Sequence, residues 1–489
     1  MDRRLASTTE SLRFRVDATR CDGQGVCVLV APELFALDRY GHAYVIPGAD
    51  HDVDPEVRAR GLEADALCPR SAIREIVAGP PVGAPVIETA RSVAASPRLA
   101  VTERESIGDW RARGGFVDHP GHAVLDLVEA AGICGQGGAA FPTAVKWRTV
   151  AAREHPIVVV NGAEREPGTI KDRYLLTRRP GLVVDGIRLA MSAVGATQAV
   201  VAIDEESTAA HDALSGALDD ASNAGLLEGL DIRIQPVPTR YVAGEETALI
   251  SVLGGGRPLP RLRPPFPADS GLFGRPTVVN NVETLAQVAV ATVLGVQEYR
   301  AVGTEQTPGT GLFSVGPFGG PYRVTERPFG YRLGDLLGEI GLLDATRAVL
   351  VGGYAGGLLT TDQLDVALTP AALNAAGASL GTKAIQVIDA RRCPIGVAAE
   401  IVGYFGSESA EQCPPCSRGL PDMAALLTGL EDGAGGPRAV EELDQFMSTL
   451  FDRGVCRLPD GAARLTMSLL TNFADDILAH AESGCPFRQ

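Results

Sequence analysis

Lysine is rare and basic side chains are in the minority in this chain of 489 residues. Lysine occurs only at Lys146, Lys171 and Lys383, and the 60 acidic side chains outnumber the 44 basic ones, which gives a formal net charge of −16. Proteins that bind nucleic acids or anionic membranes present basic faces, so this balance argues against both as partners. An acidic chain is instead typical of a soluble cytoplasmic enzyme.

Long apolar runs are also missing. The most apolar stretch, "GLVVDGIRLAMSAVGATQAVVAI", carries Asp185 and Arg188 and is broken by glycines, so it does not predict a membrane span. The N-terminal "MDRRLASTTESLRFRV" has no apolar segment behind its arginines, so it does not predict a signal peptide. We therefore expect a cytoplasmic protein without direct membrane insertion. Disulfides are uncommon there, so clustered members of the nine cysteines indicate metal sites and isolated ones buried apolar fillers.

The chain is too long for one hydrophobic core and predicts several domains. Apolar runs such as "PIVVVNG" and "QAVVAIDE" alternate with helical patterns, which is typical of a parallel sheet covered by helices. "YVAGEETALISVL" predicts a strand up to Gly244 and a helix after it. We predict a multidomain α/β protein with a small α+β unit in residues 1–80, a linker in 81–100, a Rossmann-like α/β domain in 101–304, a small β-rich, ubiquitin-like domain in 305–388 and a helical bundle in 389–489.

The first cysteine set lies in "RCDGQGVCVLVAPELF" and "ALCPRSAI". Cys21, Cys27 and a later Cys68 followed by proline fit a bacterial iron–sulfur frame whose middle cysteine is replaced by Gln24. Three thiolates suit a [3Fe–4S] cluster, whereas zinc normally takes four protein ligands in a structural site. The segment 13–76 resembles the single-cluster, three-cysteine bacterial ferredoxins, which implies a ferredoxin-like α+β domain.

Four motifs follow in the α/β region. They are "GICGQGGAAFPTAVKW" (132–147), "NGAEREPGTIKDR" (161–173), "YVAGEETAL" (241–249) and "RPLPRLRPPFPADSGLFGRPTVVNNVETL" (257–285). The glycine loop suits a phosphate cradle, although it matches neither the dinucleotide nor the P-loop pattern. In order and spacing the four motifs resemble the NADH-binding flavoprotein subunit of respiratory complex I and the diaphorase subunits of hydrogenases and formate dehydrogenases. The resemblance covers residues 100–489.

This resemblance implies binding sites for FMN and NADH. Charge repulsion by Glu246, which would accept hydrogen bonds from the adenosine ribose, should favour NADH over NADPH. Glu164 and Glu166 match the family's acidic pair beside flavin and nicotinamide, and Phe141 and Phe266 would stack on the nicotinamide nucleotide. The other implied cofactor-binding residues are Gly135, Gly137, Gly138, Lys146, Asn161, Tyr241, Gly244, Glu245, Arg263, Asn280 and Asn281.

Several positions depart from the family pattern. Arginine is often found where this chain has Cys134 and Gln136, glycine where it has Ala140 and Ala144, and aspartate where it has Ala163. Lysine is usual at the position of Arg263. We interpret Lys171 and Arg173 as ion-pair formers after the second motif.

The helical end carries "ESAEQCPPCSRG", which resembles the family's cluster motif with Ala410 at the first ligand position. Cys413, Cys416 and Cys456 occupy the other three. The site could hold [3Fe–4S], or [4Fe–4S] with Glu411, Ser409 or water as the fourth ligand. Cys393 could also supply that ligand, or the cluster could be lost. Cys134 and Cys485 have no partners by spacing, so we expect free thiols.

The resemblance implies that NADH delivers a hydride to FMN and that single electrons then pass through iron–sulfur clusters, including the fused ferredoxin, to a partner oxidoreductase. A haem monooxygenase is one candidate acceptor. An alternative is the NADH-input subunit of complex I or of a formate dehydrogenase or hydrogenase complex. An alternative of another class is a degenerate, non-catalytic scaffold, against which Glu166, Glu246 and the Asn280–Asn281 pair argue.

Overall fold

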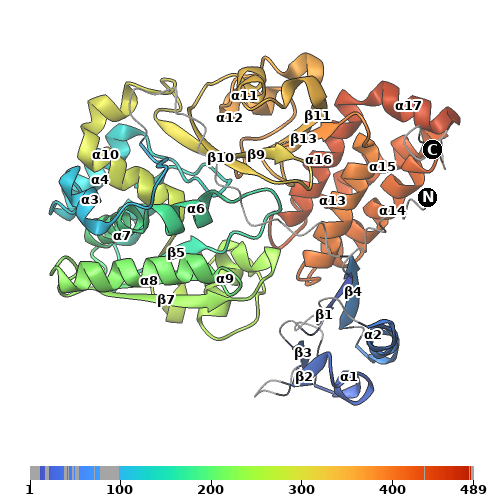
Figure 1. The fold of residues 1–489 in the computed structure, drawn as a ribbon, viewed down its shortest axis with the longest axis horizontal. Helices are drawn as coiled ribbons and strands as arrows, with labels where there is room; N and C mark the ends of the chain where they lie inside the picture. The colour runs from blue at the N-terminus through green and yellow to red at the C-terminus, as the bar shows by residue number, and fades with distance from the viewer. Residues whose placement is uncertain are drawn as a thin grey trace, which may run out of the picture. The chain divides into compact units, whose positions relative to one another are not determined.

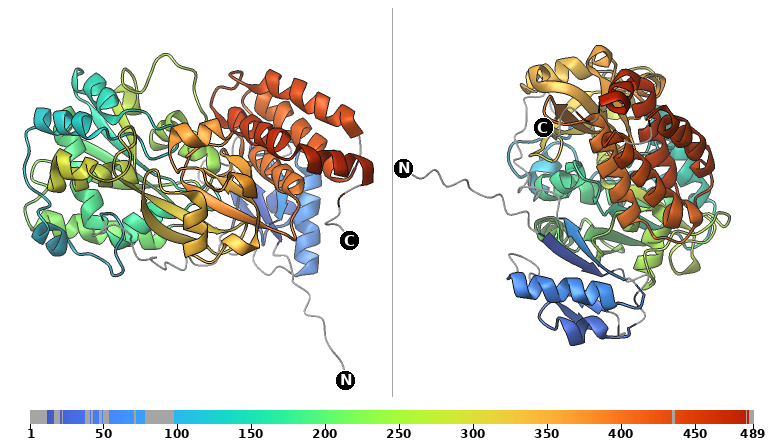
Figure 2. Two further views of the ribbon diagram at one scale, coloured as in Figure 1. Left: turned by 90° about the horizontal axis from the view of Figure 1, so that it is seen from above. Right: turned by 90° about the vertical axis from the view of Figure 1, so that its right-hand side faces the viewer.

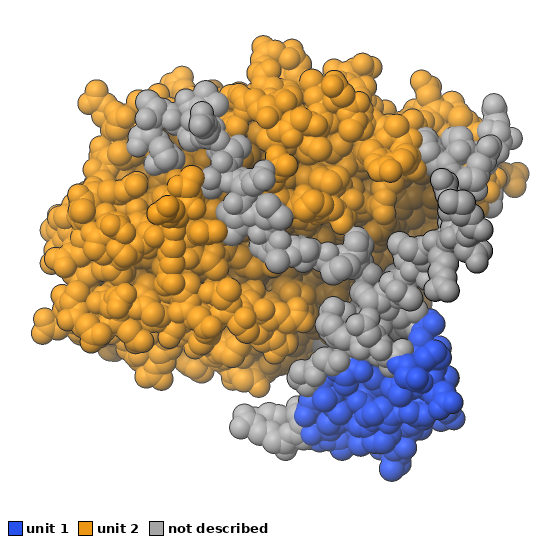
Figure 3. Space-filling view, in the orientation of Figure 1, with its two compact units in different colours: residues 1–84 blue, residues 85–489 orange. Residues whose placement is uncertain are grey.

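The chain divides into two compact units, residues 1–84 and 85–489 (Figure 3). The computed structural model describes residues 12–16, 21, 23–37, 41, 43–46, 49, 54–70, 72–77, 98–433, 436–483 and 485. None of the helices in these ranges is both long enough and apolar enough to cross a bilayer. The multidomain α/β architecture expected from the sequence is confirmed (Figure 1).

The first unit is a small α+β fold. Its elements are β1 (Leu12–Val16), α1 (Val26–Val30), β2 (Phe35–Leu37), β3 (Ala43–Val45), α2 (Pro55–Leu67) and β4 (Ile73–Val77). β1 pairs with β4 and β2 with β3, both antiparallel. Asp54 caps α2 by accepting a hydrogen bond from the Glu56 amide. Gly61 is required in α2 because a Cβ there would lie 2.3 Å from the Phe14 ring.

The second unit begins with a four-stranded parallel sheet in the order β7-β6-β5-β8. Its strands are β5 (Ile157–Gly162), β6 (Gln198–Asp204), β7 (Asp231–Val237) and β8 (Thr277–Asn281). Its helices are α3 (Ile107–Ala112), α4 (Gly121–Ala131), α5 (Thr143–Ala151), α6 (Lys171–Arg178), α7 (Pro180–Val194), α8 (Thr208–Asn223), α9 (Glu246–Leu253) and α10 (Val282–Arg300). Short 3₁₀ turns, η1 (Tyr241–Gly244) and η2 (Leu272–Gly274), complete this part.

The strand predicted up to Gly244 is wrong. Those residues form the 3₁₀ turn η1, and β7 ends earlier, at Val237. Side-chain contacts explain the turn, because the Glu408 carboxylate accepts the Tyr241 amide and the Arg240 guanidinium donates to the Ser409 carbonyl. The predicted helix after Gly244 is confirmed as α9.

A second, five-stranded sheet follows, in the order β10-β9-β13-β11-β12, with β13 and β9 parallel and the other pairs antiparallel. Its elements are β9 (Thr310–Pro317), β10 (Arg323–Pro328), α11 (Leu333–Glu339), η3 (Leu343–Ala345), β11 (Thr346–Val351), β12 (Gly357–Thr360), η4 (Thr361–Gln363), α12 (Pro370–Ala375) and β13 (Ala384–Asp389). Its strands contact α6 on one side and α16 on the other, so it joins the parallel sheet to the helical end (Figure 1).

The helical end is a bundle whose helices lie side by side in both views of Figure 2. It comprises α13 (Pro394–Glu408), a π-helical turn η5 (Pro415–Gly419), α14 (Leu420–Glu431), α15 (Gly436–Leu450), α16 (Leu458–Asn472) and α17 (Ala474–Ser483). Apolar side chains of all five α-helices share one core with residues of β11 and β12.

The end of the predicted linker 81–100 belongs to the core of the second unit, whereas residues 81–97 lie outside the described residues. Arg98, Leu99 and Ala100 are buried, and their amides donate to the buried carboxylate of Glu326 at 2.8–3.2 Å. A buried carboxylate is stable only with such donors, so this contact anchors the start of the second unit.

Candidate functional site

All four motifs meet at the carboxyl ends of β5 and β8. Asn161 and Asn281 are direct neighbours in the parallel pairing of these strands. The Asn161 amide donates to the carbonyl of Gly244 in η1 at 2.8 Å. A Cβ built on Gly137 of the glycine loop would lie 3.2 Å from the Asn281 side chain. Ligands of parallel sheets bind beyond this edge, so the sequence motifs converge where a nucleotide would be held.

The glycine loop forms a tight cradle before α5. The Gly135 amide donates to the Phe141 carbonyl at 2.9 Å, and the Gln136 amide donates to Thr284. Gly138 has φ +121°, which side-chain-bearing residues rarely adopt. Ala140, where relatives often carry glycine, is also left-handed with φ 48°. Small residues therefore let the backbone approach a bound nucleotide closely, which fits FMN.

Two charged segments, one carrying Lys146 and the other Arg263, meet at Glu246. Lys146 donates to the Glu246 carboxylate at 2.8 Å and to the Val279 carbonyl at 3.0 Å. Arg263 pairs with Glu245 at 2.8 Å and with Glu246 at 3.3 Å. Glu245 also accepts the Thr247 and Ala248 amides and so caps α9. Glu246 thus lies between two cations, an arrangement that orients its carboxylate.

Two aromatic rings are exposed on the segments that meet at Glu246. Phe141 lies just before the helix that carries Lys146, and Phe266 follows Arg263; 50 % and 52 % of their surfaces are exposed. Their exposure suits the predicted stacking on a nicotinamide nucleotide.

The predicted acidic pair has two different environments. Glu164 accepts hydrogen bonds from Thr169 and from the amides of Asp172 and Arg173, at 2.9–3.0 Å. Its carboxylate therefore holds the start of α6, and Arg173 lies 3.6 Å away as the predicted ion-pair partner. This structural role is one that the motif alone did not indicate.

Glu166 is the member of the pair that faces the second sheet. It accepts the Ala355 amide at 3.3 Å, and a Cβ on Gly353 would lie 2.5 Å from its oxygen. Burial raises the pKa of Glu166, although hydrogen bonds from Thr382 and from the backbone of Ala355 and Tyr354 oppose the rise. The loop "VGGYAGG" after β11 therefore closes over this carboxylate.

Gly353→Ala is expected to destabilise the protein by about 1–3 kcal/mol, because φ is +82° and the new Cβ would overlap Glu166. Gly216→Ala in α8 is the matched control, since no atom lies within 4 Å of the position its Cβ would take and alanine is the better helix former. Chemical denaturation of both variants should lower the free energy of unfolding only for Gly353→Ala. Equal values for the two variants would contradict the close contact with Glu166.

The two asparagines of β8 are engaged by the protein itself. Asn280 is buried and accepts the Trp147 indole N–H at 2.7 Å. Asn281 donates to Asp172, accepts from Lys171 and caps α10 through the Glu283 amide. Their side chains therefore brace the loops around the sheet edge, and contact of these side chains with the flavin remains a prediction.

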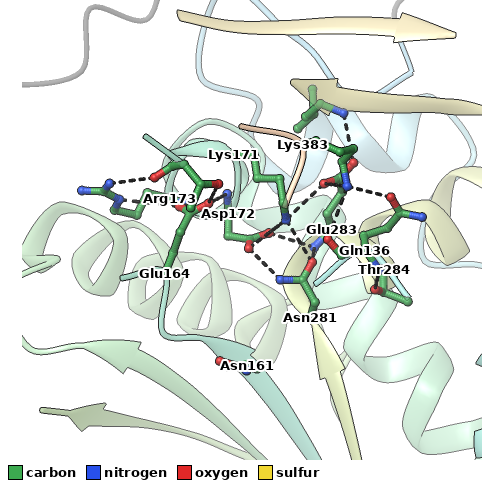
Figure 4. A network of polar contacts seen from close by, with 12 residues as sticks. Gln136, Asn161, Glu164, Lys171, Asp172, Arg173, Asn281, Glu283, Thr284 and Lys383 are labelled. Atoms are coloured by element: carbon green, nitrogen blue, oxygen red, sulfur yellow. Dashed lines mark hydrogen bonds and ion pairs between the residues drawn. The ribbon is translucent and has the colours of Figure 1, made fainter. Parts of the chain in front are cut away.

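A buried network of charges supports this site (Figure 4). Lys171 pairs with Asp172 at 2.8 Å and with Glu283 at 3.2 Å, and Lys383 pairs with Glu283 at 3.1 Å. Lys383 also donates to the Gln136 side chain at 2.8 Å. The two lysines balance the two carboxylates in charge, as burial requires.

The pKa values of Lys171 and Glu283 follow this pairing, whereas burial outweighs it at Lys383. Burial lowers the pKa of Lys383 to about 8. Burial also acts to lower the pKa of Lys171, but the attraction of Asp172 and Glu283 outweighs burial and raises that pKa. Burial acts to raise the pKa of Glu283, but the charges of Lys383 and Lys171 outweigh burial and lower that pKa.

Sequence reasoning missed Asp172, Glu283 and the role of Lys383 in this network. The rarity of lysine was the available signal, since all three lysines form buried or half-buried ion pairs around the site.

The turn η1 connects the sheet edge with the cysteines of the bundle. Tyr241 packs on Tyr404 and Phe405 of α13, with ring centroids 6.1 and 5.3 Å apart. Burial, followed by the charges of Glu166, Tyr404 and Cys456, raises the pKa of Tyr241. Tyr241 therefore packs against the same hydrophobic core as the predicted cluster ligands Cys416 and Cys456.

Cys413, Cys416 and Cys456 belong to one hydrophobic cluster of the bundle. Burial and then the neighbouring Cys413 and Cys456 raise the pKa of the Cys416 thiol, and burial raises the pKa of Cys456 to about 11. Ala410 is buried and packs with Val242 and Ala248. The structure thus brings together three thiols that could hold an iron–sulfur cluster, and Ala410 supplies no ligand.

The sequence did not predict the neighbours of two other cysteines. Cys393, considered above as a cluster ligand, instead contacts His480 and Cys485. Cys485 is a free thiol, as expected, and its neighbours Cys393 and His480 were not predicted because distant segments meet only in the fold. Cys134 is a free thiol, as expected.

Within the first unit, Cys21, Cys27 and Cys68 line one pocket. The Ala43 amide donates to the Cys21 sulfur and the Ala72 amide to the Cys68 sulfur, both at 3.3 Å. Such N–H···S contacts stabilise thiolates. Gly23 and Gly25 have positive φ, which allows the tight loop between the first two cysteines. This pocket fits an iron–sulfur cluster with three cysteine ligands.

Comparisons with known protein families agree with these sites. Residues 14–74 match a family described as a 4Fe-4S single cluster domain, 128–290 the Nuo51 FMN-binding domain, and 396–480 the NADH-ubiquinone oxidoreductase-F iron-sulfur binding region. The chain is 36% identical over 386 residues to the F subunit of NADH-quinone oxidoreductase from Mycobacterium bovis, covering 75% of this chain and 87% of the relative. The F 2 subunit of NADH-quinone oxidoreductase from Rhizobium meliloti is 34% identical over 399 residues, which is 78% and 95% of the two chains.

A solved structure is also similar. The NAD+-reducing [NiFe]-hydrogenase in the air-oxidized state aligns with a TM-score of 0.70 and 32% identity, covering 78% of this chain and 68% of that chain. In the H2-reduced state the TM-score is 0.71 with 27% identity, and the coverage is 96% and 85%. These matches confirm the resemblance drawn from the four motifs.

Proposed function

Because the chain belongs to the family of NADH-quinone oxidoreductase F subunits, we propose that it is an NADH dehydrogenase that binds FMN, NADH and iron–sulfur clusters. When bound, these groups supply the chemistry of hydride transfer from NADH to FMN and of single-electron transfer through the clusters. The protein's own residues then have to bind, orient and connect them.

The position of η1 carries this proposal. On the nucleotide side, the Gly244 carbonyl of this turn accepts the Asn161 amide at 2.8 Å. On the cluster side, the Tyr241 amide donates to Glu408 and Val242 packs with Ala410 of the cysteine motif. A nucleotide site and a cysteine set that share one short turn suit transfer of electrons between them.

The chain's residues have distinct roles in this proposal. Gly135, Gly137 and Gly138 form the cradle for FMN, with Asn161 and Gly244 joining its floor. Lys146 and Arg263 orient Glu246 toward the adenosine ribose, and Phe141 and Phe266 cover the nicotinamide nucleotide. Glu166 borders this space from the side of the second sheet. Cys21, Cys27 and Cys68 hold a [3Fe–4S] cluster in the first unit.

Cys413, Cys416 and Cys456 hold a second cluster of three irons, one per thiolate. Ser409 is a poor substitute for a fourth ligand, since its hydroxyl donates to the Gly406 carbonyl and accepts the Glu411 amide. The first unit offers a one-electron outlet to an acceptor protein. A haem monooxygenase or another oxidoreductase subunit is the class of partner we propose.

Anaerobic counts of iron, sulfide and FMN, with electron paramagnetic resonance before and after NADH, test the proposal. We expect one FMN bleached by NADH and about six irons per chain, three from each cysteine set. About three irons would mean that the bundle site is empty of cluster and that Ala410 marks its loss. Absence of NADH-bleachable flavin would instead support a non-catalytic scaffold.

Glu246→Gln is expected to lower the preference for NADH over NADPH at least roughly tenfold in kcat/KM, because repulsion of a 2′-phosphate worth about 1.4 kcal/mol or more is lost. Lys146 keeps the Val279 carbonyl as a partner and limits the structural damage. The control is Glu228→Gln, an exposed acid in the loop after α8. Steady-state kinetics with both nucleotides measure the ratio, and an unchanged ratio would remove Glu246 from ribose recognition.

A further inference from the structure

A cluster of two cysteines and one histidine lies in the helical bundle apart from the predicted cluster ligands. The Sγ atoms of Cys393 and Cys485 and a ring nitrogen of His480 all lie within 4.8 Å of one another. The Cys393 Sγ and the His480 Nε2 are 3.2 Å apart. From this geometry we propose that Cys393, His480 and Cys485 bind a zinc ion that joins the start of α13 to the end of the chain.

The histidine is oriented for a ligand role. Its Nδ1 lies 2.6 Å from the carbonyl oxygen of Asp476, one turn earlier in α17. A carbonyl only accepts hydrogen bonds, so Nδ1 carries the proton and Nε2 presents its lone pair toward Cys393. Metal-binding histidines are typically held in this way by a carbonyl or carboxylate behind the ring.

The spacing suits zinc. Ligand atoms of a tetrahedral zinc bound by sulfur and nitrogen lie about 3.3–3.8 Å apart, given Zn–S near 2.3 Å and Zn–N near 2.0 Å. The 3.2 Å between Cys393 Sγ and His480 Nε2 is slightly shorter than this range, and the 4.8 Å limit for the other pairs is slightly longer. Small side-chain movements would therefore bring the three ligand atoms to the spacing of a zinc site. Two thiolates neutralise a divalent cation, which makes the group compatible with its buried position. Water would complete the tetrahedron, as in zinc sites with three protein ligands.

The surroundings favour metal binding over two unrelated thiols. Cys393 is 6 % exposed and His480 is 1 % exposed, so a ring nitrogen faces a sulfur inside the bundle core. Cys393 is also the residue directly before α13, where the positive end of the helix dipole offsets part of the cost of burying a thiolate. An imidazole and two thiols are soft or borderline ligands of the kind that select zinc.

The ion would act as a clamp. It would close a segment of the chain that runs from residue 393 to residue 485 and includes Cys413, Cys416 and Cys456. α17 packs on α14, α15 and α16, so fixing its end to the start of α13 restrains the whole bundle. The proposal does not depend on whether the predicted iron–sulfur site is loaded.

The test uses the full chain, purified and given one equivalent of zinc under reducing conditions. Elemental analysis should find about one zinc per chain, and X-ray absorption at the zinc edge should report two sulfurs near 2.3 Å and one nitrogen near 2.0 Å. Less than about 0.1 zinc per chain in this wild-type protein would overturn the proposal, as would a Cys393–Cys485 disulfide found by mass spectrometry of freshly lysed, alkylated cells.

Variants then identify the ligands. Cys485→Ser should lose the bound zinc, and His480→Gln should weaken zinc binding by more than the roughly 10–100-fold that loss of an outer partner costs. Asp475→Asn, an exposed change in the same helix, is the control and should keep one zinc. Circular dichroism shows whether each variant is folded. Folded Cys485→Ser protein that still holds one zinc would refute the assignment, whatever the other variants do.

Discussion

Glu283→Ala is expected to lower the free energy of unfolding of the second unit by about 3–5 kcal/mol, the usual cost of removing one partner from a buried ion pair. Glu283 is fully buried and pairs with both Lys171 and Lys383. It also accepts the Leu312 amide of β9 at 3.0 Å. Its loss would leave two buried ammonium groups with only Asp172 to balance them. Chemical denaturation followed by circular dichroism measures the change.

Two comparisons separate this effect from simple loss of volume. Glu298→Gln, an exposed change in the same helix α10, should alter the free energy of unfolding by less than about 0.5 kcal/mol. In a double-mutant cycle, Glu283→Gln and Lys383→Met should together cost about 1–3 kcal/mol less than the sum of the single changes. Strict additivity would show that the two side chains do not stabilise each other.

Ala410→Cys is expected to add about one iron per chain, from about six to about seven, by restoring the fourth ligand of the bundle cluster. Ala410 is buried beside Val242 and Ala248 and stands three residues before Cys413. A thiol at position 410 therefore enters the cysteine set with little change in volume. An oxidised [4Fe–4S] cluster is diamagnetic, so the oxidised protein should show one paramagnetic cluster per chain in place of two.

Ala410→Ser is the matched control, because it changes the same position without adding a thiolate. It should keep about six irons and both paramagnetic clusters. If Ala410→Cys holds the same iron as the parent and its new thiol reacts freely with an alkylating reagent, the proposed three-iron cluster at Cys413, Cys416 and Cys456 is wrong.

Local sequence signals carried much of the fold. Apolar runs that alternate with helical patterns predicted the parallel sheet. Strands buried on both faces are continuously apolar in sequence, as Ile157–Gly162 is. The failure at Tyr241–Gly244 is instructive. Glu408 accepts the Tyr241 amide and the Ser409 carbonyl accepts the Arg240 side chain, more than 160 residues later, and no local propensity reports such contacts.

The candidate site divides in the same way. The resemblance carried by the four motifs and by the cysteine motif at Ala410 implied the roles of the glycine loop, Glu166, Glu246 and the nearby cysteines. The sequence also determined the acidic character of the chain and the three-cysteine set of residues 1–80.

Only the tertiary structure decided which charges meet. Glu283 and Lys383 are 100 residues apart, and Cys393 and Cys485 lie at opposite ends of the bundle sequence. It likewise assigned Glu164 to the start of α6 and left Glu166 facing the second sheet. The physical reason is that burial and pairing are properties of three-dimensional neighbours, whereas a sequence pattern reports only neighbours along the chain.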